Sequence, residues 1–155
     1  MNIDKYSVLS GQIENYIKGK LNVDDIIHQD MFLTFYENLI QMGGDLAVCG
    51  CVRRNVETKE DTLCGPEKNT LVCGTDIIQL FKRMKMEQRY WILDYIWNKW
   101  YKKEVIERYH IRFTEKLSLG EDFVFNTQYF QHISSFVMIS KFLYKYEVHM
   151  DGLAS

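Results

Sequence analysis

The chain has 155 residues, of which 46% are hydrophobic and 14% aromatic, with a single proline and a formal net charge of −2. This size and balance are typical of one folded domain and exclude a largely disordered chain. Apolar runs are too short to cross a bilayer, and the first residues do not resemble a signal peptide. We therefore expect one domain over residues 1–150 and a frayed tail at 151–155, located in the cytoplasm without membrane contact.

The first third of the chain has the periodicity of helices. Apolar residues recur at steps of three and four over 6–17 and again over 22–42, and Gly43 follows the second segment. The period then changes, because 46–52 and 70–73 are short apolar runs with β-branched residues on either side of a polar stretch. These runs predict a short β-hairpin or an irregular insertion over about 45–74.

Helical patterns return in the second half of the chain. We expect helices over 77–85, 87–101 and 102–110, an irregular segment over 111–125 and a final helix over 126–146 that is apolar nearly all round. The predicted fold class is therefore mainly α: a single helical domain interrupted by one cysteine-bearing insertion.

The four cysteines all lie within this insertion. Four thiolates can bind zinc in tetrahedral geometry, and zinc can organise a segment that is too polar to form its own core. The spacing differs from the paired CxxC motifs of zinc ribbons, however, so unligated thiols, or a disulfide or redox pair, remain alternatives. The predicted cofactor is one structural zinc, with these ligands: Cys49, Cys51, Cys64 and Cys73.

Motifs typical of catalysis are absent from the sequence. The four histidines are scattered, and no glycine-rich segment has the spacing of a phosphate-binding loop. Neighbouring acids such as Asp24 and Asp25 are more typical of helix capping than of catalysis. An enzyme is therefore not the expected class, and no catalytic residue is assigned.

Positive charge is concentrated in the middle of the chain, where residues 76–116 carry ten basic and six acidic side chains. The helices expected over 87–101, 102–110 and 126–146 invite comparison with a helix-turn-helix, in which the last helix reads base edges. The polar residues at its start would contact bases, and nearby basic residues would contact phosphates. The resulting nucleic-acid set is Lys99, Lys102, Lys103, Arg108, Arg112, Asn126, Thr127 and Gln128.

Within this region the stretch from Gln88 to Tyr109, QRYWILDYIWNKWYKKEVIERY, resembles small phage-encoded late transcription regulators of the ArpU and RinA kind. The resemblance covers 22 of the 155 residues and implies a DNA-binding or transcription-associated regulator of viral origin. Together with the basic helices, it makes such a regulator the first functional hypothesis.

Aromatic residues crowd the same region and support a second hypothesis. Six aromatic side chains within 90–101 cover too much of one helix for a single core-facing stripe. Because Trp and Tyr dominate interface hot spots, some of them could bind a protein partner or a second copy of the chain. The alternative function is a protein–protein interaction module or inhibitor, with these contact residues: Trp97, Trp100 and Tyr101.

Overall fold

The computed structural model describes residues 26–87, 91–114, 117 and 119–148, and within them strands and helices alternate. The first half contains β1 (Ile26–Ile27), α2 (Met31–Met42), β2 (Leu46–Asn55), β3 (Asp61–Cys64), β4 (Thr70–Cys73) and α3 (Thr75–Glu87). The second half contains α4 (Trp91–Asp94), β5 (Lys99–Tyr101), α5 (Lys103–Arg108), α6 (Glu121–Phe130) and β6 (Ser135–Val148).

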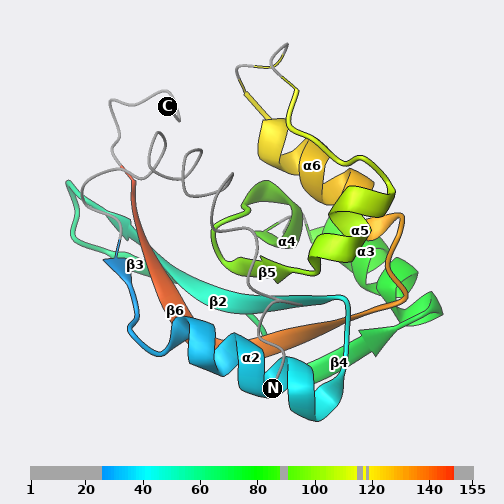
Figure 1. Ribbon diagram of the computed structural model, residues 1–155. Helices are drawn as coiled ribbons and strands as arrows, with labels where there is room; N and C mark the ends of the chain where they lie inside the picture. The colour runs from blue at the N-terminus through cyan, green and yellow to red at the C-terminus, as the bar shows by residue number, and fades with distance from the viewer. Residues whose placement is uncertain (1–25, 88–90, 115–116, 118, 149–155) are drawn as a thin grey trace.

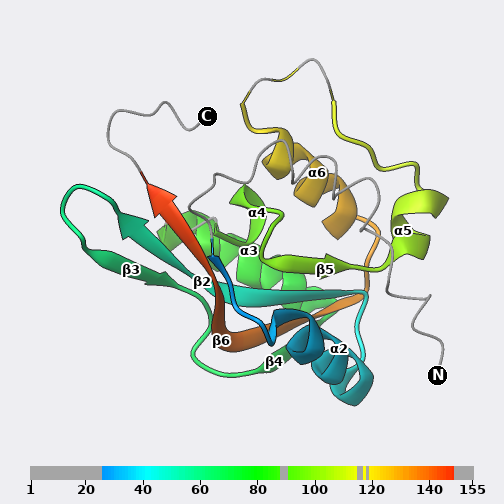
Figure 2. The same cartoon turned by 60° about the vertical axis from the view of Figure 1, so that its left-hand side comes forward.

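The strands of the described residues form one mixed sheet around β6 and β2. These two long strands run parallel to each other from Ala47 opposite Val137 to Asn55 opposite Val148, with a register shift on either side of Gly50. β6 also pairs antiparallel with β1 and β4, and β2 pairs antiparallel with β3 and β5. Figures 1 and 2 show the helices divided between the two faces of this sheet, with α2 on one side and α3 to α6 on the other.

Alternation along β2 explains how the two faces differ. Leu46 and Val48 pack into a core cluster with residues of α3 to α6, whereas Ala47, Cys49 and Cys51 pack with α2. Successive side chains of a strand point to opposite faces, so one strand can supply both cores. β2 and β6 are therefore covered on both sides, which is why they read as nearly continuous apolar runs.

The prediction of a mainly α fold is wrong, because the sheet is the centre of the molecule. The largest error concerns 126–146: α6 ends at Phe130, and 135–148 form the longest described strand. Phe136, Val137, Met138 and Ile139 are all buried, since α2 packs on one face of the strand and the other helices pack on the opposite face. An all-round apolar pattern fits a buried helix and a doubly covered strand equally well, and periodicity cannot separate them.

Two neighbouring segments also differ from expectation. The long helix expected over 87–101 is instead the short helix α4, a turn and the edge strand β5. The segment over 111–125 is not irregular throughout, because α6 begins at Glu121 directly after Gly120, whose φ is 83°. Both changes matter for the site below, since they bring the α4–β5 turn and the start of α6 together.

Other expectations agree with the structure. The apolar runs 46–52 and 70–73 are strands, although they join the central sheet and do not form a separate insertion. The short helices expected over 77–85 and 102–110 are α3 and α5, and the segment over 22–42 contains α2 after β1. The helix expected over 6–17 and the tail over 151–155 lie outside the described residues. Among those that are described, no helix has the length and apolar character needed to cross a membrane.

Candidate functional site

A polar centre lies where the turn between α4 and β5 meets α6. The turn is fixed by Asn98, which is fully buried and whose Nδ2 donates to the backbone oxygen of Cys49 at 3.0 Å. The backbone N–H of Cys49 in turn donates to the backbone oxygen of Asn98 at 3.0 Å. This pair of bonds fixes the turn to β2 and leaves the Asn98 side-chain oxygen available to its neighbour Lys99.

Lys99 is the most unusual residue of this centre. Its side chain is 8% exposed, and its Nζ donates to Asn98 Oδ1 at 2.8 Å and to the backbone oxygen of Tyr95. Burial lowers the pKa of Lys99 to about 7, against the opposing influence of several nearby groups, of which Asp122 is the strongest. Lys99 therefore changes charge near neutral pH, where an ordinary lysine is always charged.

Two carboxylates act electrostatically on this lysine. Asp94 ends α4, and its pKa is raised by burial in spite of the positive charges of Lys99 and Arg53. Asp122 lies in the first turn of α6 and acts electrostatically on Lys99 and on the buried Tyr101. Because the N-terminal end of a helix carries partial positive charge, the first turn of α6 is a favourable place for the Asp122 carboxylate.

Asn126 fixes α6 against the turn. Its Nδ2 donates to the backbone oxygens of Leu93 at 2.7 Å and Tyr95 at 2.9 Å, and its Oδ1 accepts from the Tyr101 hydroxyl at 2.5 Å. Asn126 and Asp122 are four residues apart on a helix and so share one face, which directs Asp122 toward the same turn. We call this group the Lys99 centre, and its members are Asp94, Tyr95, Asn98, Lys99, Asp122 and Asn126.

Stacked aromatic rings border the centre on the sheet. Trp97 stacks on Tyr144, with ring centroids 4.0 Å apart, and on Tyr95 at 4.6 Å. Burial raises the pKa of the Tyr95 hydroxyl to about 12. Beside the rings, the Nε of Arg53 is buried and has no hydrogen-bond partner among the described residues. The centre therefore has an apolar wall that could shield a reaction from water.

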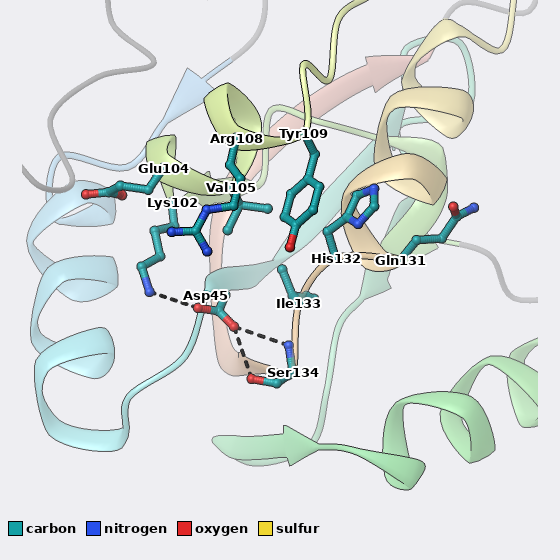
Figure 3. Close-up of a pocket in the computed structure, with 10 residues that line it drawn as sticks. All are labelled: Asp45, Lys102, Glu104, Val105, Arg108, Tyr109, Gln131, His132, Ile133 and Ser134. Carbon is teal, nitrogen blue, oxygen red and sulfur yellow. Dashed lines mark hydrogen bonds and ion pairs between the residues drawn. The ribbon is translucent and has the colours of Figure 1, made fainter.

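A separate pocket of 460 Å³ lies at the other end of α6. Figure 3 shows its residues around Asp45, whose Oδ1 is 2.9 Å from the Nζ of Lys102 and whose Oδ2 accepts from the backbone N–H of Ser134 at 3.2 Å. Burial raises the pKa of Asp45, but these bonds and the charge of Lys102 outweigh it and the net shift is downward. Tyr109 and His132 stack at 3.8 Å on one side. The Asp45 oxygens are therefore bonded to Lys102 and Ser134.

The residues predicted to contact nucleic acid do not form one surface. Lys99 and Asn126 are buried in the Lys99 centre, and the Thr127 hydroxyl is buried as well. Lys102 is paired with Asp45 and half-buried, and Arg112 is bound to Glu107 at 3.2 Å. Three others lie at or near the surface on two different helices: Lys103 and Arg108 of α5, and Gln128 of α6.

The predicted zinc site is contradicted by the positions of its ligands. Cys51 lies opposite Tyr144 on β6, whereas the exposed Cys73 lies opposite Ser135, nine residues away along the same strand. Nine residues of strand span about 30 Å along the chain, far beyond one coordination sphere. No group of three or more His, Cys, Asp or Glu side chains in the described part of the chain is placed to hold a metal ion.

The aromatic residues predicted to bind a partner are largely engaged inside the molecule. Tyr101 is 2% exposed and bonded to Asn126. Trp97 belongs to the aromatic stack, and Trp100 packs edge-on against Phe32 and Phe35 of α2. They contribute to the two cores instead of standing free as a surface stripe.

Sequence reasoning missed the acids of the Lys99 centre. Asp94 was placed within a long helix, and Asp122 within an irregular segment. The available signal was Gly120 followed by Glu121 and Asp122, which is a typical start of a helix because glycine precedes acids in the first turn.

The chain is similar to two known proteins, one in sequence and one in fold. No family model matches the chain. Its sequence is 24% identical over 135 residues to the uncharacterized glycosyltransferase EpsJ of Bacillus subtilis (strain 168), covering 87% of this chain and 38% of EpsJ. Its fold is similar to that of S. aureus TarS 1-349, solved in complex with UDP-GlcNAc, with a TM-score of 0.61, 17% identity and coverage of 84% of this chain and 34% of TarS.

These similarities correct the functional prediction. The chain spans little more than a third of the length of either protein. EpsJ is a glycosyltransferase by name and the TarS structure holds UDP-GlcNAc, and neither indicates transcription regulation, so the hypothesis of a DNA-binding regulator is contradicted.

Proposed function

We propose that this chain functions in glycosyl transfer, with a sugar passing from a nucleotide sugar to an acceptor hydroxyl at the Lys99 centre. The similarity to EpsJ in sequence and to TarS in fold supports the reaction class, and the UDP-GlcNAc bound to TarS supports a nucleotide sugar as donor. The observation that carries the proposal is Lys99, which is buried and hydrogen-bonded to the α4–β5 turn, to which Asn126 of α6 is also bonded.

Asp122 is the proposed general base. Transfer to a hydroxyl requires that the acceptor oxygen lose its proton as it bonds to the anomeric carbon, while the nucleotide leaves with the electron pair of the broken bond. An ionised carboxylate can take that proton. Asp122 lies at the positive end of α6 and beside Lys99, and both positive influences favour its ionised form.

Lys99 is the proposed positioning residue for this base. Its two hydrogen bonds to the α4–β5 turn hold the amine in place, and its charge responds to pH near 7. When Lys99 is protonated, it stabilises the negative charge of Asp122 before the reaction. Asn126 assists by fastening α6 to the same turn, so that Asp122 and Lys99 keep their relative positions.

The test is release of UDP from UDP-GlcNAc by the purified chain in the presence of a panel of mono- and oligosaccharide acceptors. We expect Asp122→Asn to lower the rate by about 100- to 10,000-fold, the usual effect of removing a general base. Glu121→Gln is the matched control, since it removes the adjacent charge in the same helical turn and should change the rate less than about threefold.

Two results would overturn the proposal. The first is a folded wild-type chain that releases no nucleotide from UDP-GlcNAc or from other common nucleotide sugars. The second is an Asp122→Asn variant that retains the wild-type rate, which would show that the proton is taken elsewhere. Circular dichroism of each variant separates loss of activity from loss of structure.

A further inference from the structure

The strands β2 and β3 bring two cysteines face to face. Cys51 and Cys64 are direct partners in the antiparallel register of the two strands. Residues opposed in this way have Cα atoms about 4.5–5.5 Å apart, which lies within the range of about 4.4–6.8 Å that disulfides require. The backbone already has the spacing of a disulfide, although all four cysteines are in the free form.

The side chains of the pair also meet. A hydrogen bond between the Cys51 and Cys64 thiols, together with burial, raises the pKa of Cys51. Next to the pair, a Cβ atom added to Gly65 would come within 2.9 Å of the Gly50 Cα, so the two strands approach each other closely here. Neither thiol would need more than a side-chain rotation to reach the other.

The other two cysteines are not comparable partners. Cys49 is two residues from Cys51 on the same strand, where side chains point the same way and Cα atoms are about 6.6–6.8 Å apart, at the limit for a disulfide. Cys73 is exposed on β4, opposite Ser135 and far along β6 from the pair. The fold therefore selects one pair from the four cysteines.

We propose that Cys51 and Cys64 are a redox-reactive pair that closes to an intramolecular disulfide when the protein meets a peroxide. Cys64 reacts first because it is half-buried, whereas Cys51 is fully buried. The Cys64 sulfur attacks one peroxide oxygen, giving a sulfenic acid and one water. The Cys51 sulfur then attacks the sulfenic sulfur, and the S–S bond forms as a second water leaves. Two thiols are oxidised and one hydrogen peroxide is reduced to two waters.

The disulfide would join β2 to β3 without moving either strand. Closing this loop restricts the unfolded chain, so the oxidised protein should unfold at a temperature several degrees higher than the reduced protein. The strand-paired position should also protect Cys64 from further oxidation, because its partner thiol traps the sulfenic acid as soon as it forms. This property is independent of the proposed glycosyl transfer.

The experiment treats the native full chain with hydrogen peroxide, unfolds it in guanidinium so that buried thiols become accessible, alkylates the remaining thiols with N-ethylmaleimide and measures intact mass and tryptic peptides. We expect two alkylated thiols where the reduced protein has four, a crosslink involving Cys64, and recovery of four thiols after dithiothreitol. Cys49→Ser and Cys73→Ser should each still form the crosslink. Cys51→Ser and Cys64→Ser should each lose it.

Several outcomes would overturn the proposal. Four thiols that still react after peroxide, or a crosslink that survives Cys51→Ser, would each contradict an intramolecular Cys51–Cys64 pair. Sulfinic acid at Cys64 in the wild type would show that Cys51 does not trap the intermediate. Because Cys51 is in the core and its substitution could impair folding, Cys64→Ser, at the less buried position, gives the same test in a folded protein.

Discussion

Lys99 and Lys102 lie three residues apart on either side of Tyr101, yet they differ in burial and in the charge of their partners. Lys99 is buried, donates hydrogen bonds to the uncharged oxygens of Asn98 and Tyr95, and has a pKa lowered to about 7. Lys102 is partly exposed and forms an ion pair with Asp45 at 2.9 Å. Residue type alone does not separate a lysine that can exchange a proton near pH 7 from one that holds two segments together. Burial and the charge of the partner separate them.

The largest effect is expected at Asn126, whose hydrogen bonds hold the α4–β5 turn that carries Lys99. Asn126→Ala removes the donor for the Leu93 and Tyr95 oxygens and the acceptor for the Tyr101 hydroxyl. Buried polar groups that lose their partners each cost about 1–3 kcal/mol, so we expect the free energy of unfolding to fall by about 3 kcal/mol. Urea denaturation measures it. Gln128→Ala, on the exposed side of the same helix, should change it by less than about 0.5 kcal/mol; equal losses for the two variants would contradict this assignment.

The next largest effect is expected in the pH dependence of stability, which Lys99 and Lys102 should influence differently. The pKa of Lys99 is about 7 in the folded protein and 10.5 as its ordinary value, so between these pH values the unfolded chain binds more protons. Stability contributed by this site therefore rises with pH above 7, by at most about 1.4 kcal/mol per pH unit. Relative to Lys99→Met, the wild type should gain about 1–2 kcal/mol from pH 7.0 to 8.5 in urea denaturation.

Lys102→Met is the control for that pH series. Its difference from the wild type should stay nearly constant over the same range, because Lys102 remains beside the Asp45 carboxylate. Using differences between variants cancels the contributions of the buried cysteines and tyrosines, which also titrate at high pH. Parallel curves for the wild type and Lys99→Met would show that Lys99 keeps an ordinary pKa in the folded protein.

The smallest effect is expected at the Lys102–Asp45 pair. Asp45→Asn should cost about 1–2 kcal/mol, since it weakens the bonds to both Lys102 and Ser134, and Lys102→Met should cost no more than about 1 kcal/mol. The folded pKa of Asp45 is lowered, so its contribution is present above its ordinary value of 3.8 and is lost as pH falls through the lowered pKa. Relative to Asp45→Asn, the wild type should therefore lose stability as the pH is lowered below about 3.8. A difference between these two proteins that stays constant over that range would contradict this.

Part of the fold was predictable from the sequence, and the unpredicted part follows from how the strands are covered. The runs 46–52 and 70–73 are strands, in agreement with the hairpin, one of the two alternatives predicted from their short apolar pattern with β-branched residues. β6 was not, because α2 and the other helices cover its two faces and remove the alternation that marks a half-exposed strand. The edge strand β5 has three residues, too few to show any period.

The candidate site was less predictable than the fold. Lys99 and Asn126 were singled out, but as groups that contact nucleic acid from the surface. Their real environment depends on the Cys49 backbone, the Leu93 oxygen and the Tyr101 hydroxyl, which lie 25 to 50 residues away from the atoms they bind. Such contacts exist only after the sheet has formed, so no local sequence pattern predicts them.

β6 is synthesised after the strands that pair with it, and this order affects how the protein folds in a cell. β6 is the last described element, yet β1, β2 and β4, which precede it by 60 to more than 100 residues, all pair with it. While a ribosome is making the chain, those strands have no central partner, and the apolar residues of β2 stay accessible to other molecules. Pairings this distant in sequence form slowly, and the waiting strands are prone to aggregate. Yield in a cell should therefore depend on chaperone supply and growth temperature more strongly than the stability of the finished protein would suggest.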